Sequence, residues 1–310
     1  MPAVSVIMPV YGAEATLARS LDCLRAQTFT DWEAILVDDG SPDGCGEICD
    51  RAATADSRFR VMHRPNGGVA AARQAGIEAA DGDYAIHMDP DDTVSPEMLA
   101  RLTERARETG AGMVVCDFVT ISPRGTQYSR QQPSSGDAGD VLADLFMGLH
   151  GSCCNKLIAR KYYKAARFEP GLNLQEDLLY IVRVLRRGPS VTYLGEAFYQ
   201  YYYHMQASAT TTYTAEVFRR LCRVHRLIGA ELAGYPDVER LHRRQAAVYL
   251  SKVGLSARDL GGSEYRRVMW RLLWPLLSSR DSVSRKWLAV AACAGLKPLT
   301  DAVLRRHPLY

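Results

Sequence analysis

Three carboxylates lie within four residues of one another, at Asp89, Asp91 and Asp92. Like charges this close repel one another, and a hard divalent cation or the hydroxyl groups of a ligand relieve the repulsion. Oxygen-only ligation suits Mg²⁺ or Mn²⁺. The alternative is a solvated turn that caps a helix, because Ser95-Pro96 is typical of a helix start. By itself, the cluster indicates either a metal site or such a turn.

The short apolar run before these carboxylates, residues 84–88, alternates as a β-strand does. Asp89 therefore lies where a strand leaves the core. Further strands are expected at 4–8, 32–37 and 58–63, and each is followed by residues at helical spacing or by a turn that opens a helix. This alternation predicts a mostly parallel sheet with helices on both faces.

In such a sheet, ligands bind beyond the carboxyl ends of the strands. Tyr11, the pair Asp38-Asp39 and the acidic cluster all fall there. The glycine pair Gly67-Gly68 opens the third helix and lets backbone approach a ligand closely. No Gly-x-Gly-x-x-Gly follows the first strand and no P-loop is present, so neither usual dinucleotide nor usual ATP binding is indicated.

Four segments resemble, in their order and spacing, the signatures of family 2 inverting glycosyltransferases. They are Val4-Ser-Val-Ile-Met-Pro-Val-Tyr11, Ile35-Leu-Val-Asp-Asp-Gly-Ser41, Asn66-Gly-Gly-Val-Ala-Ala-Ala-Arg73 and Met88-Asp-Pro-Asp-Asp92. The resemblance covers residues 1 to about 205. It implies a GT-A fold, a nucleotide-diphosphate sugar as donor and a divalent metal, Mn²⁺ or Mg²⁺.

The resemblance also implies site residues, carried over position by position. The nucleotide-sugar-binding set is Pro9, Val10, Tyr11, Asp38, Asp39, Asn66, Arg73 and Asp89. Within this set, the segment from Pro9 to Tyr11 lines the nucleobase pocket and Asp39 receives a base N–H. Arg73 faces the base or the phosphates, and Asp89 faces the ribose or the sugar. Asp91 holds the metal.

Several of these residues also have a purely structural interpretation. Asp38-Asp39-Gly-Ser41 also fits a helix-capping turn, and Arg73 also fits a surface ion pair. Pro90 stands where the family often has serine, and it stiffens the turn without removing a ligand.

The acceptor half has two further segments that resemble the family. Gly151-Ser-Cys-Cys-Asn-Lys-Leu-Ile158 carries Asn-Lys-Leu, and Phe168-Glu-Pro-Gly-Leu-Asn-Leu-Gln-Glu-Asp-Leu179 carries Glu-Asp. An acceptor hydroxyl is a poor nucleophile, so inversion by direct displacement needs a carboxylate as base. We expect Asp177 to be that base, with Glu176 positioning the acceptor or exchanging roles with it. The alternative is that both only add negative charge to the first turn of a helix.

Other parts of this half are open to more than one interpretation. Residues 122–140 are polar and predict a mobile loop. The tyrosines of 199–204 suit a sugar platform, although alternate burial in an edge strand explains them equally well. His204 lies where some relatives of the family place a further phosphate or metal contact, so it is a second candidate metal ligand.

The C-terminal part differs in charge from the rest of the chain. Residues 1–214 carry 20 Lys and Arg against 27 Asp and Glu, whereas residues 215–310 carry 18 against 8. Helices are expected in this basic part, with Trp270, Trp274 and Trp287 among arginines. It is interpreted either as an interfacial anchor for an anionic membrane or as a helical cap, and the anchor would leave some of these tryptophans exposed. Nucleic acid is disfavoured, because no binding motif accompanies the charge.

The expected cellular setting follows from composition and from absent signals. The eight cysteines show no zinc spacing and predict a reducing compartment. The N-terminus lacks a signal-peptide pattern, and no segment reaches about 18 consecutive apolar residues. A cytoplasmic enzyme, peripheral at the inner face of the plasma membrane, is therefore expected.

The sequence predicts an α/β protein with a GT-A-type, Rossmann-like, mostly parallel sheet and a helical C-terminal extension. The expected domains are a catalytic domain at 1–213 and a helical basic region at 214–310. The expected function is metal-dependent, hexosyl-type transfer with inversion, from a UDP-sugar to a saccharide or lipid-linked glycan in surface polysaccharide synthesis. The alternatives are a nucleotidylyltransferase on a similar sheet and a noncatalytic nucleotide- or glycan-binding protein.

Overall fold

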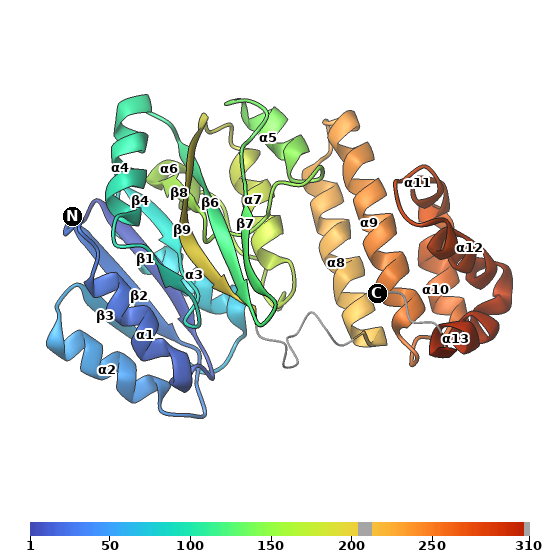
Figure 1. Cartoon of the computed structure of the whole chain (residues 1–310), viewed down its shortest axis with the longest axis horizontal. Helices are drawn as coiled ribbons and strands as arrows, with labels where there is room; N and C mark the ends of the chain where they lie inside the picture. Colours follow the sequence, from blue (N-terminus) through green and yellow to red (C-terminus); the bar gives the residue numbers. More distant parts are fainter. Residues whose placement is uncertain (204–212, 307–310) are drawn as a thin grey trace. The chain divides into compact units, whose positions relative to one another are not determined.

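The computed structural model of the chain describes residues 1–203 and 213–306. The chain divides into two compact units, Met1–Met205 and Gln206–Tyr310. The first unit is a sheet flanked by helices, and the second unit is helical (Figure 1). The predicted α/β class, GT-A-type sheet and helical extension are confirmed.

Four parallel strands form the first part of the sheet, in the order β3-β2-β1-β4. Their bounds are β1 Val4–Val10, β2 Trp32–Asp38, β3 Phe59–His63 and β4 Tyr84–His87. Every residue of β1 and β2 is buried, as expected for parallel strands that are covered on both faces. The helices that connect these strands are α1 Glu14–Arg25, α2 Cys45–Ala55 and α3 Val69–Ala79.

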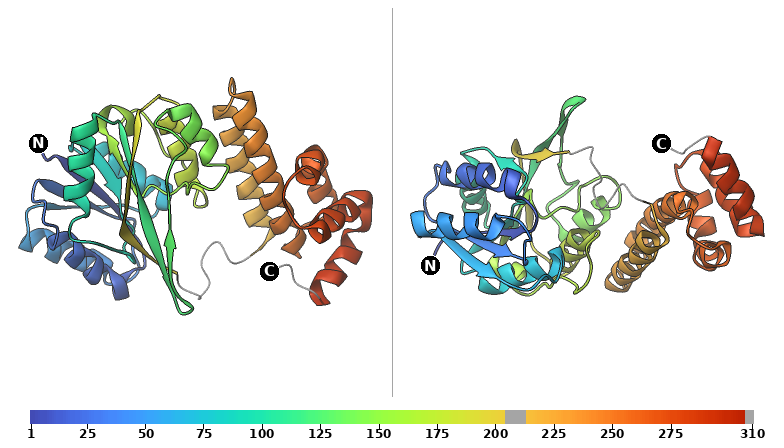
Figure 2. Two further views of the ribbon diagram at one scale, coloured as in Figure 1. Left: turned by 45° about the horizontal axis from the view of Figure 1, so that its top comes forward. Right: turned by 90° about the horizontal axis from the view of Figure 1, so that it is seen from below.

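The two faces of these strands pack against different helices (Figure 2). Val6 and Met8 of β1 point into the core cluster that includes Leu17 and Leu21 of α1. Ile7 points to the opposite face, where a Cβ on Gly76 of α3 would lie only 2.4 Å from the Ile7 side chain. Glycine at position 76 therefore permits the close packing of α3 on β1.

The first strand is longer than the expected range 4–8 and does not stop at Pro9. β1 continues through Pro9 to Val10, paired with β2 up to the register Val10↔Asp38. Its pairing with β4 ends earlier, at Ile7↔His87. Backbone groups alternate between the two sides of a strand, so the N–H that proline lacks would point to the side that β4 has already left.

The later strands extend the sheet and mix its directions. β6 runs parallel to β9, while β8 pairs antiparallel with both β4 and β6, and β5 pairs antiparallel with β9. The bounds of these strands and of the remaining helices of the first unit are β5 Thr93–Val94, β6 Met113–Ser122, β7 Gly125–Ser129, β8 Lys156–Ala159, β9 Val191–Tyr202, α4 Met98–Thr109, α5 Ala138–Asp144, α6 Arg160–Tyr163 and α7 Glu176–Leu185.

The interpretation of residues 122–140 as a loop was wrong in part. This stretch contains β7, which forms a hairpin with β6, and the start of α5. Gly125 has φ of +118° and allows the tight reversal. The Tyr128 hydroxyl donates to Asp117 Oδ2 at 2.5 Å, which ties the hairpin to the buried part of β6.

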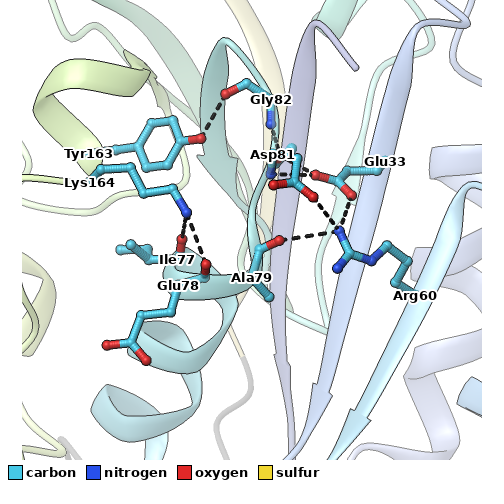
Figure 3. Close-up of polar contacts among 10 residues, drawn as sticks. Glu33, Arg60, Ile77, Glu78, Ala79, Asp81, Gly82, Tyr163 and Lys164 are labelled. Carbon is cyan, nitrogen blue, oxygen red and sulfur yellow. Dashed lines mark hydrogen bonds and ion pairs between the residues drawn. The ribbon is translucent and has the colours of Figure 1, made fainter. Parts of the chain in front are cut away.

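A connected polar network closes the amino end of the sheet (Figure 3). Glu33 accepts hydrogen bonds from Ser5 Oγ and from the backbone N–H of Asp81, both at 2.7 Å. Arg60 donates to Glu33 at 2.7 Å and to Asp81 at 3.1 Å. Lys164 donates to two carbonyl oxygens at the end of α3. These groups satisfy one another and tie β1, β2 and β3 to the turn that enters β4.

The second unit contains six α-helices in its described part. They are α8 Ala215–Glu231, α9 Pro236–Ser256, α10 Gly262–Met269, α11 Leu273–Leu277, α12 Val283–Ala291 and α13 Lys297–Arg306, with the short turns η1 Trp270–Leu272 and η2 Ala292–Leu296. Phe218 of α8 and Tyr265 of α10 stack beside Gly254 of α9, where a Cβ would lie 2.7 to 2.8 Å from both rings. No helix among the described residues is long and apolar enough to cross a membrane.

Candidate functional site

The predicted nucleobase segment follows the buried part of β1. Pro9 and Val10 are buried at the end of β1. The Val10 carbonyl oxygen accepts the backbone N–H of Asp39 at 2.9 Å. The Tyr11 side chain, by contrast, is 55% exposed. Tyr11 therefore presents the aromatic surface of this segment to solvent.

Asp39 holds the glycine turn from which α3 begins. Its carboxylate is 2% exposed and accepts the backbone N–H of Gly68 at 2.7 Å and that of Gly67 at 3.1 Å. Gly68 has φ of +85°, and a Cβ there would lie 2.3 Å from the side chain of Asn173. Only glycine suits this position. Arg64 adds an ion pair to Asp39 at 3.2 Å. Whether Asp39 also receives a base N–H stays a prediction.

Asp38 points to different partners from its neighbour. Its carboxylate lies 2.9 Å from His63 Nδ1 and accepts the backbone N–H of Ser41 at 3.0 Å. Burial alone would raise the pKa of Asp38, but the hydrogen bonds from Ser41 and His63 lower it below its ordinary value. The hydrogen bonds to Asp38 and then to Asp50 raise the pKa of His63. With these partners Asp38 shapes the turn after β2, and its contact with a donor stays a prediction.

Arg73 joins the donor half of the sequence to the acceptor half. Its side chain is 7% exposed. Nη2 donates to Asp89 Oδ1 at 2.8 Å, and Nη1 donates to Glu176 Oε1. The alternative of a surface ion pair was therefore wrong, because this pair is buried. Breaking such a pair by removing one partner typically costs about 3–5 kcal/mol.

Glu176 and Asp177 begin helix α7, and they have different surroundings. Gln175, just before them, has φ of 54° and is the only non-glycine residue with positive φ in the described part of the chain. Glu176 is buried against Arg73. Burial and the neighbouring Asp177 raise the pKa of Glu176 to about 7, although Arg73 counteracts them. Asp177 is half-buried, and its Oδ1 accepts the N–H of Leu178 at 2.8 Å.

The acidic loop after β4 contains one inward carboxylate and two that are partly accessible. Asp92 is fully buried and accepts the Tyr199 hydroxyl at 2.6 Å and the Tyr202 backbone N–H at 2.8 Å. Burial, and then the charge of Asp89, raise the pKa of Asp92 to about 8. Asp89 keeps 27% of its side chain exposed, and Asp91 is half-buried. The accessible carboxylates of this loop are therefore those of Asp89 and Asp91.

The loop suits a metal that is shared with a substrate. Within the part of the chain that the structure describes, no three His, Cys, Asp or Glu side chains gather so that they could hold a metal ion. Mg²⁺ is commonly held by one or two carboxylates together with substrate phosphates. The partly accessible carboxylates fit such a site, with Asp91 as the predicted ligand. His204, the second predicted ligand, lies outside the described residues.

Lys156 is a site residue whose role the sequence did not reveal. Its side chain is completely buried, and Nζ donates to the carbonyl oxygens of His150 and Ser152 and to Asn155 Oδ1, at 2.7 to 2.8 Å. Burial lowers its pKa to about 8. The segment that Lys156 ties together contains Cys154, whose Sγ lies 3.6 Å from Asp89 Oδ2. The Asn-Lys-Leu resemblance was the available signal, but it carried no role.

The structure therefore brings some predicted residues together and leaves others apart. Arg73, Asp89 and Glu176 are in direct contact, and Asp39 lies at the start of the helix that carries Arg73. Asn66 is exposed in the turn before the glycine pair. The sequence allowed two interpretations of Tyr199, as part of a sugar platform or as a buried strand residue. In the structure Tyr199 is buried, and its hydroxyl donates a hydrogen bond to Asp92.

The sequence is similar to those of known glycosyltransferases. The family model Glycosyl transferase family 2 matches residues 5–167. The uncharacterized glycosyltransferase EpsJ of Bacillus subtilis is 34% identical over 213 residues, which is 65% of this chain and 61% of EpsJ. The alignment thus spans less than two thirds of that relative. The putative teichuronic acid biosynthesis glycosyltransferase TuaG of Bacillus subtilis is 25% identical over 232 residues, 72% of this chain and 90% of TuaG.

The fold has solved counterparts. The crystal structure of S. aureus TarS 1-349 in complex with UDP-GlcNAc superimposes with a TM-score of 0.71 at 19% identity, covering 100% of this chain and 93% of that chain. The likeness shows the GT-A fold. Because the family model matches more than half of the sequence, the chain belongs to glycosyltransferase family 2.

Proposed function

We propose that this chain transfers a sugar, with inversion, from a nucleotide-diphosphate sugar to a saccharide or lipid-linked glycan in surface polysaccharide synthesis. One observation carries the proposal most directly. Arg73 contacts both Asp89, at the end of a donor-side strand, and Glu176, in the predicted acceptor segment. A donor bound at the strand ends and a base on α7 would therefore share one site.

We take the donor to be a UDP-sugar. TarS, which shares this fold, was solved with UDP-GlcNAc and with UDP. Tyr11 and Asp39 lie at adjacent strand exits, where a base could stack on the ring and donate to the carboxylate. Pro9 and Val10 would support Tyr11 from the end of β1, and Asn66 and Asp38 lie in the flanking turns. Arg73 supplies a buried positive charge beside the leaving diphosphate.

In an inverting transfer, the base that takes the proton of the acceptor and the groups that stabilise the leaving diphosphate lie on opposite sides of the sugar. The acceptor hydroxyl gives its proton to Asp177 as its oxygen bonds to the anomeric carbon. The bond from that carbon to the nucleotide diphosphate breaks in the same step, so the diphosphate leaves with the electron pair and the configuration inverts. Asp91, with His204 as a second candidate, would hold Mn²⁺ or Mg²⁺, which neutralises charge on the diphosphate when bound.

The two carboxylates at the start of α7 take separate roles in this proposal. The side chains of adjacent helical residues point about 100° apart, so Glu176 and Asp177 cannot both accept a hydrogen bond from the same acceptor hydroxyl. Glu176 is engaged by Arg73, whereas Asp177 Oδ1 accepts the N–H of Leu178 and, among the described residues, its Oδ2 has no hydrogen-bond partner. That oxygen could face a substrate. Asp177 is therefore the proposed base, and Glu176 positions Arg73.

We also propose different functions for the two parts of the chain. Residues 1–213 would bind the nucleotide sugar and catalyse transfer, and the basic helical region 214–310 would make contact outside the reaction. We place the enzyme in the cytoplasm, peripheral at the inner face of the plasma membrane. Names of relatives such as TuaG support a role in polysaccharide synthesis.

The test is nucleotide-sugar turnover by the full chain without acceptor. A panel of UDP- and GDP-sugars with Mn²⁺ is screened by thermal shift, because a ligand at about 100 times its Kd stabilises by about 2.7 kcal/mol. The sugar that stabilises should then be hydrolysed slowly to the nucleoside diphosphate, and Asp177→Asn should bind it without hydrolysis. Stabilisation with no turnover by the parent chain would favour a noncatalytic binding protein. Formation of a nucleotide sugar from a nucleoside triphosphate and a sugar phosphate would favour a nucleotidylyltransferase.

A further inference from the structure

One face of the segment α10–η1–α11 is unusual for a surface exposed to water. Its inner side carries the buried residues Tyr265, Met269 and Leu276. On an amphipathic helix, the residues on the opposite, outward-facing side are usually polar. This side instead carries Trp270 at 66% exposure and Trp274 at 78% exposure. Large rings in water at successive turns indicate that this side has a partner.

Arginines surround these two tryptophans. A groove of about 370 Å³ lies between this segment and the first half of α9, and a second hollow of about 470 Å³ lies along α10. Together they are lined by six arginines and one acidic residue. We call the surface formed by Arg240, Arg243, Arg244, Arg266, Arg267, Trp270, Arg271 and Trp274 the Arg/Trp face.

Within the described residues, most of these arginines are not paired with a carboxylate. Arg240 lies 3.4 Å from Asp237. Among the residues that the structure describes, Arg243, Arg244 and Arg271 have no carboxylate within 4.0 Å. The second unit as a whole has 18 Lys and Arg against 8 Asp and Glu. The partner must therefore supply negative charge.

We propose that the Arg/Trp face binds the surface of a lipid bilayer that contains anionic phospholipids. Headgroup phosphates would pair with the arginines, and the two indole rings would enter the boundary between headgroups and acyl chains, where tryptophan is favoured. Leu277, which is 40% exposed and lies three residues after Trp274, would add apolar contact. The proposal does not depend on which sugar the catalytic unit transfers.

Two other occupants fit the face less well. A second copy that paired through the same face would bring twelve arginines together, and like charges oppose such a symmetric contact. Single-stranded nucleic acid would satisfy the arginines and could stack on the rings. It would leave the aliphatic Leu277 in water, however, whereas the boundary between headgroups and acyl chains of a bilayer would cover that side chain.

The test uses the full chain with vesicles of phosphatidylcholine, alone or in an equimolar mixture with phosphatidylglycerol. We expect sedimentation only with the mixed vesicles, weaker binding as salt rises, and a blue shift of tryptophan emission. The variant Arg243→Gln/Arg244→Gln/Arg271→Gln should bind about 100-fold more weakly, because each basic residue at an anionic surface contributes about fivefold. The corresponding triple lysine variant should keep most of the binding, since charge and not the guanidinium fork is required.

A matched control removes three arginines elsewhere. Arg101→Gln/Arg105→Gln/Arg107→Gln on α4 of the first unit deletes the same charge and should leave vesicle binding within about twofold. Circular dichroism must show all variants folded. Trp270→Ala/Trp274→Ala should abolish most of the blue shift, because Trp32 is buried and only Trp287 remains exposed.

Three outcomes would overturn the proposal. The first is full-length protein that ignores mixed vesicles at low salt. The second is an equal loss of binding in the α4 control, which would show that total charge alone acts. The third is tight binding to a single-stranded oligonucleotide without a response to vesicles, which would assign the face to nucleic acid. Vesicle binding is measured without any sugar donor, so its failure would leave the proposed transferase activity untouched.

Discussion

Replacing the buried Lys156 by methionine tests how the site loop is held. Methionine keeps the length and most of the volume of lysine but cannot donate. The substitution would leave the carbonyl oxygens of His150 and Ser152 and Asn155 Oδ1 without their present donor. It would also remove a buried charge. The sign of the effect depends on which of these two terms is larger.

Both terms follow from the structure. The pKa of Lys156 falls from 10.5 to about 8, which corresponds to about 3 kcal/mol of disfavoured charge at neutral pH. Each buried acceptor that loses its donor costs about 1–3 kcal/mol. Three such acceptors outweigh the relief of charge, so we expect Lys156→Met to lower the free energy of unfolding by about 2–4 kcal/mol at neutral pH.

The pH dependence has a definite sign. The folded pKa lies below the unfolded value, so between pH 8 and pH 10.5 the unfolded chain binds more protons at this position and the stability of the parent rises with pH. The methionine variant has no such group. Its deficit relative to the parent should therefore widen by about 2–3 kcal/mol from pH 8 toward pH 10.5.

The assay is urea unfolding of the parent and the variant at several pH values. Lys164→Met is the matched control, because Lys164 is exposed and its Nζ donates to two carbonyl oxygens, at 2.8 and 3.0 Å (Figure 3). Water can replace that lysine, so we expect a loss of at most about 1 kcal/mol. Equal losses in the two variants, or a deficit for Lys156→Met that does not change with pH, would refute the reasoning.

Three further predictions concern the reaction itself. Asp177→Asn should lower kcat about 100-fold or more while donor binding is nearly unchanged, and a larger loss in Glu176→Gln, measured in the same turnover assay, would reverse the two roles. Asp91→Asn should abolish metal-dependent turnover with an unchanged thermal midpoint, and parent activity that persists in EDTA would contradict the metal. Asp39→Ala should weaken UDP binding by about 1–3 kcal/mol in calorimetry, because both a base acceptor and the anchor of Gly67 are lost; equal affinities would argue against that role.

Local signals explain why much of the first unit could be predicted. Each early strand is an apolar run that ends in a turn, and a parallel sheet then brings all such ends to one edge. The positions of Asp39 and Asp89 at that edge follow from this rule alone. The hairpin of β7 was missed because its strand is mostly exposed and polar, so it lacks the alternation that marks a half-buried strand.

Long-range pairing explains most of what could not be predicted. Arg73 and Glu176 are 103 residues apart, and their contact depends on how α7 packs in the folded chain. The contact of Asp38 with His63 depends on the register of β2 with β3. The burial of Lys156 likewise depends on β8 lying between β4 and β6. No periodicity within one segment carries such information.

The acidic loop after β4 is completed by a strand that the ribosome makes much later. Tyr199 and Tyr202 of β9 lie 107 and 110 residues beyond Asp92, and they hold it in place. A nascent chain therefore exposes three carboxylates for a long interval before the groups that fix them exist. A fragment that ends at residue 167, where the family match ends, would lack both β9 and the start of α7. Such a fragment should neither order this loop nor turn over a donor, even if its first four strands fold.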